Sequence, residues 1–87
     1  MTIKYNSVTH DVLVYAKMIK RPFRAPEPMV VFARMDRLSK VNRSINMLIK
    51  EGLLKDCGDE NYEITKSGID RVYFLARNHK SEVHSFD

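Results

Sequence analysis

Cysteine and long apolar runs are the scarcest features of this 87-residue chain. The single cysteine, Cys57, cannot form an internal disulfide, and no second cysteine stands at metal-ligand spacing. No apolar run approaches the roughly 18 residues that cross a bilayer, and the N-terminus lacks the apolar segment of a signal peptide. We therefore expect one cytoplasmic domain over residues 1–87 that makes no membrane contact, since a chain of this length holds one core.

Catalytic motifs are missing as well. The chain contains no Gly-rich phosphate loop, no nucleophile elbow and no HExxH motif. Its histidines, His10, His79 and His84, share no metal-ligand spacing with cysteines or carboxylates. We therefore expect no enzyme activity, no cofactor and no metal site.

Charge is plentiful but unevenly distributed along the chain. Residues 1–50 hold ten Lys and Arg against three Asp and Glu, whereas residues 51–87 hold five against eight. The net charge of +4 thus combines +7 in the first part with −3 in the second. A one-sided basic surface suits a polyanion, and nucleic acid is the commonest intracellular polyanion. The alternative is that these charges serve solubility alone.

The most informative stretch is residues 38–51. Apolar residues recur there at helical spacing and form one stripe: Leu38, Val41, Ile45, Leu48 and Ile49. Ser39 can cap the start of this helix, and Gly52 suits a left-handed turn at its end. The opposite face is polar and basic, with Ser39, Lys40, Arg43, Asn46 and Lys50. Such a face is what base edges and phosphates require, although most amphipathic helices only face water.

Prolines and caps place the elements before this helix. Residues 1–6 form an N-terminal arm, and a helix over residues 7–21 begins at a cap on Ser7 or Thr9. All three prolines lie in residues 22–28 and end that helix. Pro28 can open a second helix over residues 28–36, whose apolar side chains pack beneath the helix over 38–51.

Turn residues and periodicity place the elements after it. The turn-rich segment 56–61 predicts a β-hairpin over residues 53–65. A last helix follows over residues 67–78, and a frayed tail over residues 79–87. The order predicts a mainly α fold with a small β-hairpin, of the α+β class.

The first and last helices carry more apolar residues than one buried stripe needs. A helix that is apolar around much of its circumference buries more than one side. This surplus predicts a partner, and the simplest partner is a second copy of the chain.

Two spaced motifs give the chain a family resemblance. A helix of the pattern VxRxhxxLxxxGLh, with h apolar, precedes a strand of the pattern YxhTxxG. The matching residues are Val41, Arg43, Ile45, Leu48, Gly52, Leu53 and Leu54, then Tyr62, Ile64, Thr65 and Gly68. Over residues 8–78 the chain thereby resembles winged helix-turn-helix DNA-binding proteins, most closely small bacterial, archaeal and phage regulators of MarR-like and PadR-like type.

The resemblance implies a three-helix core, a two-stranded wing and a C-terminal helix. It also implies a sequence-specific regulator of transcription that binds double-stranded DNA, namely a dimeric repressor with helix 38–51 in the major groove. The side chains expected at base edges or nearby phosphates are Ser39, Lys40, Asn42, Arg43 and Asn46. Those expected on the DNA backbone are Arg37, Lys50 and Lys55.

The wing departs from the family pattern, because its tip carries Asp59, Glu60 and Asn61, beside Asp56, in place of basic residues. Carboxylates facing phosphates are repulsive. Either the wing stands clear of DNA, or it contacts a protein partner. The alternative function is therefore a winged-helix protein–protein interaction module, such as a phage-encoded modulator or a replication accessory factor. A replication-initiator fragment that binds origin repeats is a third interpretation.

Overall fold

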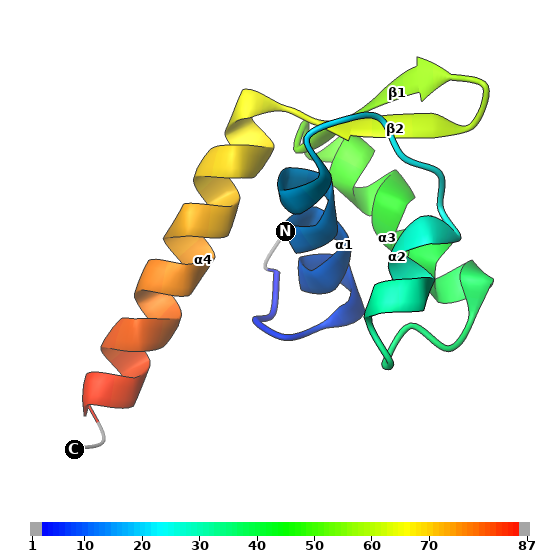
Figure 1. Cartoon of the computed structure of the whole chain (residues 1–87). Helices are drawn as coiled ribbons and strands as arrows, with labels where there is room; N and C mark the ends of the chain where they lie inside the picture. Colours follow the sequence, from blue (N-terminus) through cyan, green and yellow to red (C-terminus); the bar gives the residue numbers. More distant parts are fainter. Residues whose placement is uncertain (1–2, 86–87) are drawn as a thin grey trace.

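The computed structural model describes the backbone of residues 3–85 and the side chains of residues 3–78. Within this range the elements are α1 (Val8–Ile19), α2 (Glu27–Val31), α3 (Leu38–Lys50), β1 (Leu54–Gly58), β2 (Asn61–Ile64) and α4 (Lys66–Ser85). The described chain is therefore a mixed α+β fold of four helices and a two-stranded antiparallel hairpin (Figure 1), in agreement with the fold class that the sequence predicted.

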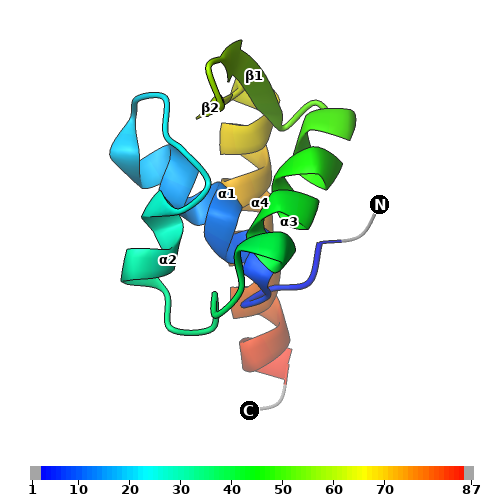
Figure 2. The same ribbon diagram turned by 90° about the vertical axis from the view of Figure 1, so that its right-hand side faces the viewer.

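Helix α1 lies at the centre of the fold. It contacts α2, α3 and α4, and Figure 2 shows α2 and α3 on opposite sides of it. Val12, Leu13 and Ala16 are fully buried in these contacts. Burial of such side chains stabilises a fold by about 1.5–3 kcal/mol for each of the larger ones.

The ends of α1 are set by local backbone chemistry. Ser7 caps the start, where its Oγ accepts a hydrogen bond of 3.2 Å from the backbone N–H of His10. Lys20 adopts a left-handed conformation with φ of 55°. The helix therefore ends at Ile19, two residues before the predicted boundary at Arg21, because a left-handed residue cannot continue a right-handed helix.

Helix α2 corrects the sequence prediction, since it covers only Glu27–Val31 and not residues 28–36. Phe32 is extended, with φ of −112° and ψ of 114°, and the chain then runs as a loop to α3. Arg34 is drawn to the buried Asp11 of α1, with Nε 2.8 Å from Oδ2, and Met35 is buried. Tertiary contacts of Arg34 and Met35 therefore lie in a loop where the local apolar pattern predicted a helix.

The apolar residues of α2 also differ from expectation. Val30 is 90% exposed and Val31 is 56% exposed, so neither packs beneath α3. The first turn instead rests on Pro28, which is buried, and on Glu27, whose Oε2 accepts a 2.7 Å hydrogen bond from the backbone N–H of Arg24. This hydrogen bond closes the turn that leads into α2.

Helix α3 starts at the predicted residue and ends at Lys50. Its N-cap is Arg37, without a side-chain capping bond, and Ser39 lies inside the first turn. The prediction that Ser39 caps the helix is therefore wrong: the extended backbone that begins the helix falls two residues earlier. Gly52 has the predicted left-handed φ of 77°. The N–H of Leu53 donates to the carbonyl of Leu48 over 2.9 Å, which closes the helix end.

The buried face of α3 differs from the predicted stripe at its first residue. Val41, Ile45 and Leu48 are buried, whereas Leu38 is 43% exposed. Ser44 is buried as well, and its Oγ lies 2.8 Å from Thr9 Oγ1 of α1. This hydroxyl pair satisfies two polar groups between the helices.

The hairpin pairs Leu54 with Ile64 and Gly58 with Asn61, with a bulge between Asp56 and Gly58. Asp59 and Glu60 form the two-residue turn, and both have left-handed φ values of 52° and 62°. Two positive φ angles match the right-handed twist of a hairpin.

A contact that the sequence did not predict holds the hairpin against the segment between α1 and α2. Phe23 and Tyr62 exchange two backbone hydrogen bonds of 2.8 Å. The Phe23 ring is fully buried. The Pro-rich segment thus adds a short third strand position beside β2.

Helix α4 is longer than the predicted helix over residues 67–78. It runs from Lys66 to Ser85 and extends along one side of the molecule beyond the other helices (Figure 1). The prediction of a frayed tail over 79–87 is therefore wrong for residues 79–85, which are helical, while residues 86–87 lie outside the described residues. No proline interrupts this stretch, so nothing local ends the helix at Asn78.

The N-terminal arm, predicted over residues 1–6, is described from Ile3 onward. It forms no strand, and Ile3 is buried against the core. None of the helices in the described part of the chain is long and apolar enough to span a bilayer.

Candidate functional site

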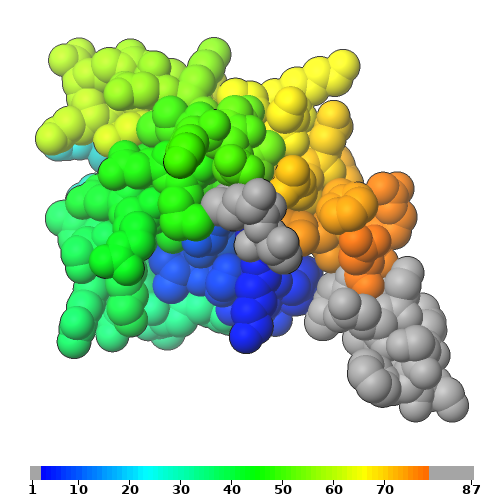
Figure 3. Space-filling view, turned by 180° about the vertical axis from the view of Figure 1, so that it is seen from behind, coloured from blue at the N-terminus to red at the C-terminus, as the bar shows by residue number. Residues whose placement is uncertain are grey.

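The outward face of α3 gathers most of the side chains that the sequence singled out. Opposite the buried residues, a shallow open depression is lined by Ser39, Asn42, Arg43, Asn46, Met47 and Lys50. All six belong to α3, and the space-filling view from behind (Figure 3) shows α3 in green as a broad surface next to the hairpin. Because the other face is fixed in the core, these side chains project from a rigid support.

Three cations on or next to this face form no ion pair with a described carboxylate. Within residues 3–78, no carboxylate forms an ion pair with Arg37, Arg43 or Lys50. All three are exposed. Their charge is therefore available to a negatively charged ligand.

Two other predicted site residues are engaged within the chain. Lys40 Nζ lies 3.2 Å from Asp36 Oδ1, and this hydrogen bond together with the lysine charge lowers the pKa of Asp36. The Nζ of Lys55, on β1, lies 3.3 Å from Oε1 of Glu63, on β2. A ligand phosphate would compete with a carboxylate for each of these lysines.

The hairpin has fewer unpaired carboxylates than its sequence suggests. Glu60 Oε2 lies 2.9 Å from a terminal guanidinium nitrogen of Arg24. Asp56 Oδ1 accepts a 2.8 Å hydrogen bond from the backbone N–H of Gly58. Most of the hairpin carboxylates therefore already have partners within the chain.

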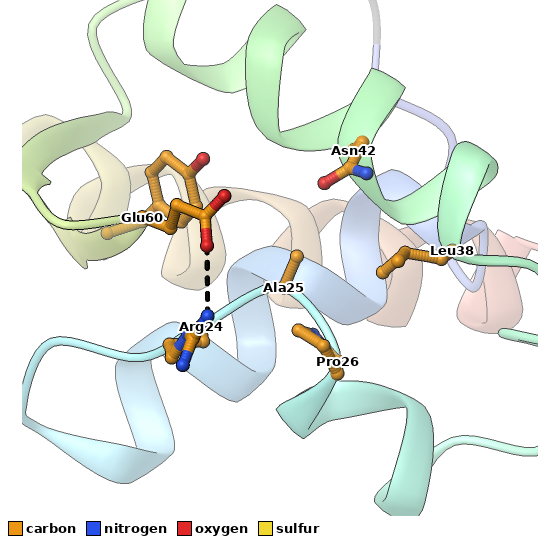
Figure 4. A pocket seen from close by; sticks show the side chains of 7 residues that line it. Arg24, Ala25, Pro26, Leu38, Asn42 and Glu60 are labelled. Carbon is orange, nitrogen blue, oxygen red and sulfur yellow. Dashed lines mark hydrogen bonds and ion pairs between the residues drawn. The ribbon is translucent and has the colours of Figure 1, made fainter.

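A hollow of about 210 Å³ separates the hairpin from α3. Its lining comes from the segment before α2, from the start of α3 and from the hairpin: Arg24, Ala25, Pro26, Leu38, Asn42, Glu60 and Tyr62. Figure 4 shows Arg24 and Glu60 facing each other at one end, with Asn42 and Leu38 of α3 at the other. Sequence reasoning missed Arg24 as a site residue, because a pair separated by 36 positions leaves no local signal.

The buried polar cluster on α1 has a structural role. Burial raises the pKa of Asp11, while the charge of Arg34 opposes that rise. His10 Nδ1 accepts a 3.1 Å hydrogen bond from the backbone N–H of Asn6, and its ring lies 4.5 Å from that of Tyr5. These contacts fix the N-terminal segment and the loop before α3.

The described residues also bear on metal and cysteine chemistry. Among them, no group of three His, Cys, Asp or Glu side chains is placed to hold a metal ion. Cys57 is exposed on β1 at the bulge.

Comparison of the chain with protein-family models, with curated proteins and with solved structures found no match.

Proposed function

We propose that this chain is a winged helix-turn-helix protein that binds double-stranded DNA and regulates transcription as a repressor, with α3 as its recognition helix. The observation that carries the proposal is the open face of α3, where Arg43 and Lys50 lie among polar side chains and form no ion pair with a carboxylate of residues 3–78. In this proposal the hairpin β1–β2 is the wing.

The size of α3 supports this mode of binding. The helix has 13 residues, so at about 1.5 Å per residue it is about 20 Å long. The major groove is about 12 Å wide and admits one α-helix. The depression on α3 is open rather than enclosed, as a surface that meets a duplex must be.

Each side chain of the face suits a distinct contact. Arg43 can donate two hydrogen bonds to a guanine, and Asn42 or Asn46 can pair with an adenine. Lys50 and Arg37, toward the two ends of α3, are placed for phosphates. Lys40 and Lys55 would add phosphate contacts only after exchanging Asp36 and Glu63 for DNA.

A homodimer is part of the proposal, and α4 is the surface that supports it. Tyr73 is 59% exposed and Phe74 is 47% exposed on this helix. Helix α1, which the sequence also marked as a dimer element, has most of its apolar residues in the core and exposes Met18. Light scattering should report about twice the chain mass of 10.2 kDa, and Phe74→Glu should halve it.

The alternative, a protein-interaction module that uses an acidic wing, has less support. Glu60 pairs with Arg24 and Glu63 with Lys55, which leaves less free negative charge for a basic partner.

The test of the proposal is selection of DNA from a random duplex pool by the purified full chain. We then expect binding isotherms to separate the selected duplex from a scrambled one at physiological salt. The affinity should fall with added salt, with a log–log slope of about −0.9 per phosphate contact. Absence of binding to any duplex would sink the proposal and favour the interaction module.

A further inference from the structure

The ion pair between Arg24 and Glu60 is not needed to hold the hairpin in place. Two backbone hydrogen bonds join Phe23 to Tyr62, and the backbone N–H of Arg24 is fixed by Glu27 over 2.7 Å. The two charged side chains are themselves 59% and 78% exposed. Exposed ion pairs contribute little to stability, so this pair can open at little cost.

The pair lies on a surface continuous with the face of α3. Asn42 lines both the depression on α3 and the hollow that contains Arg24 and Glu60. A DNA strand that follows α3 past Asn42 would therefore bring a phosphate toward Arg24. Glu60 stands at the same point, where its carboxylate repels that phosphate and occupies the guanidinium.

We propose that Arg24 is a further phosphate-binding residue of the DNA interface and that Glu60 holds it back in the native chain. The inference rests on the proposed DNA-binding function. Glu60 then weakens DNA binding, because its carboxylate occupies the Arg24 guanidinium that would otherwise bind a phosphate.

The turn itself offers a matched control. Asp59 and Glu60 are neighbours with similar left-handed φ values, but only Glu60 pairs with Arg24. Glu60→Gln and Asp59→Asn each remove one negative charge and a general electrostatic effect would be nearly equal for both. Only the release of Arg24 would make the two substitutions differ in their effect on DNA affinity.

The experiment measures DNA affinity at several salt concentrations for the full chain carrying each substitution. Glu60→Gln should raise affinity about three- to tenfold at low salt and steepen the log–log slope by about 0.9, the value for one added phosphate contact. Asp59→Asn should change affinity less than about twofold and leave the slope unchanged. Arg24→Gln should have little effect alone, yet abolish the whole gain of Glu60→Gln when the two are combined.

Other outcomes overturn the inference. Equal gains for Glu60→Gln and Asp59→Asn, or a gain that survives Arg24→Gln, would show a general charge effect. Weaker binding by a folded Glu60→Gln chain would show that the pair serves the interface as it stands. If Glu60→Gln does not fold, Glu60→Asn, which tolerates the left-handed turn, replaces it. If the wild-type chain binds DNA but the substitutions change neither affinity nor salt slope, this inference alone is wrong. If the wild-type chain binds no DNA, the proposed function is wrong as well.

Discussion

The face of α3 and the hairpin are both rich in charged residues, but those of α3 are largely unpaired and those of the hairpin are largely paired. Arg43 and Lys50 on α3 have no acidic partner among the described residues. On the hairpin, Glu63 pairs with Lys55 and Glu60 pairs with Arg24. Formal charge counted along the sequence therefore overstates the negative charge that the hairpin can offer to a partner.

The two regions also differ in how they are anchored. Helix α3 rests on three buried apolar side chains, Val41, Ile45 and Leu48. On β1 only Leu54 is buried, and two backbone hydrogen bonds between Phe23 and Tyr62 attach the hairpin to the segment before α2. Changes beneath α3 should therefore cost more stability than changes in the hairpin.

The largest expected effect is the loss of the support beneath α3. Leu48→Ala should lower the free energy of unfolding by about 2–5 kcal/mol, because it removes a fully buried side chain and leaves a cavity. Urea unfolding measures this loss. Asn46→Ala, on the exposed face of the same helix, should stay within about 0.5 kcal/mol of wild type. A similar loss for both would contradict the division of α3 into a buried and an open face.

The second effect concerns the base of the hairpin, where Gly68 of α4 approaches Leu53 and Ile64. A Cβ on Gly68 would overlap the backbone carbonyl oxygen of Leu53 and lie 2.6 Å from Ile64 Cγ1. Gly68→Ala should therefore destabilise the chain by about 1–3 kcal/mol, as overpacking does. Ser67→Ala, at the exposed neighbouring position, is the control for thermal unfolding. An unchanged midpoint for Gly68→Ala would mean that α4 and the hairpin are less closely packed.

The third effect separates the free cations of α3 from the paired cation of the hairpin. Arg43→Ala should weaken DNA binding by about 1–3 kcal/mol if the guanidinium reads a guanine. Uniform weakening on all sequences, with a shallower salt slope, would instead assign Arg43 to a phosphate. Lys55→Ala should cost less affinity, because Lys55 already pairs with Glu63.

Asn46→Ala is the uncharged control for that measurement, and it should leave the salt slope unchanged. Normal affinity and slope in a folded Arg43→Ala chain would show that α3 does not dock as proposed.

The smallest effect is a pH dependence of the loop on which the hairpin rests. The hydrogen bond from the backbone N–H of Arg24, and then the contact with Arg21, lower the pKa of Glu27 below its ordinary value of 4.5. A lowered pKa in the folded state stabilises the fold above pH 4.5. That stabilisation is lost as the pH falls through the folded-state pKa.

Unfolding by urea on both sides of this pH range measures the effect. Glu27→Gln should lose about 1 kcal/mol at neutral pH, because it weakens the hydrogen bond from the backbone N–H of Arg24 and removes the ion pair with Arg21. The variant should also lose less further stability on acidification than wild type. An equal acid loss in both chains would place the responsible carboxylate elsewhere.

Local sequence signals account for much of α3 and the hairpin. The apolar spacing of Val41, Ile45 and Leu48 sets the buried face, and Gly52 ends the helix because it readily adopts a positive φ. The turn-rich residues between Lys55 and Tyr62 mark the hairpin for a similar reason. Each of these features depends on residues close together in the chain, which is why the sequence alone could predict them.

Only the tertiary structure decided the length of α2 and which carboxylates of the hairpin are paired with cations. The apolar run after Pro28 is compatible with a longer helix, but Asp11, from a distant turn of α1, draws Arg34 into a loop. Likewise the sequence gives no sign that Glu60 is paired, because its partner Arg24 lies 36 residues away and approaches it only in the folded chain. Both outcomes depend on contacts between segments that the chain brings together only on folding, and periodicity and caps carry no information about such contacts.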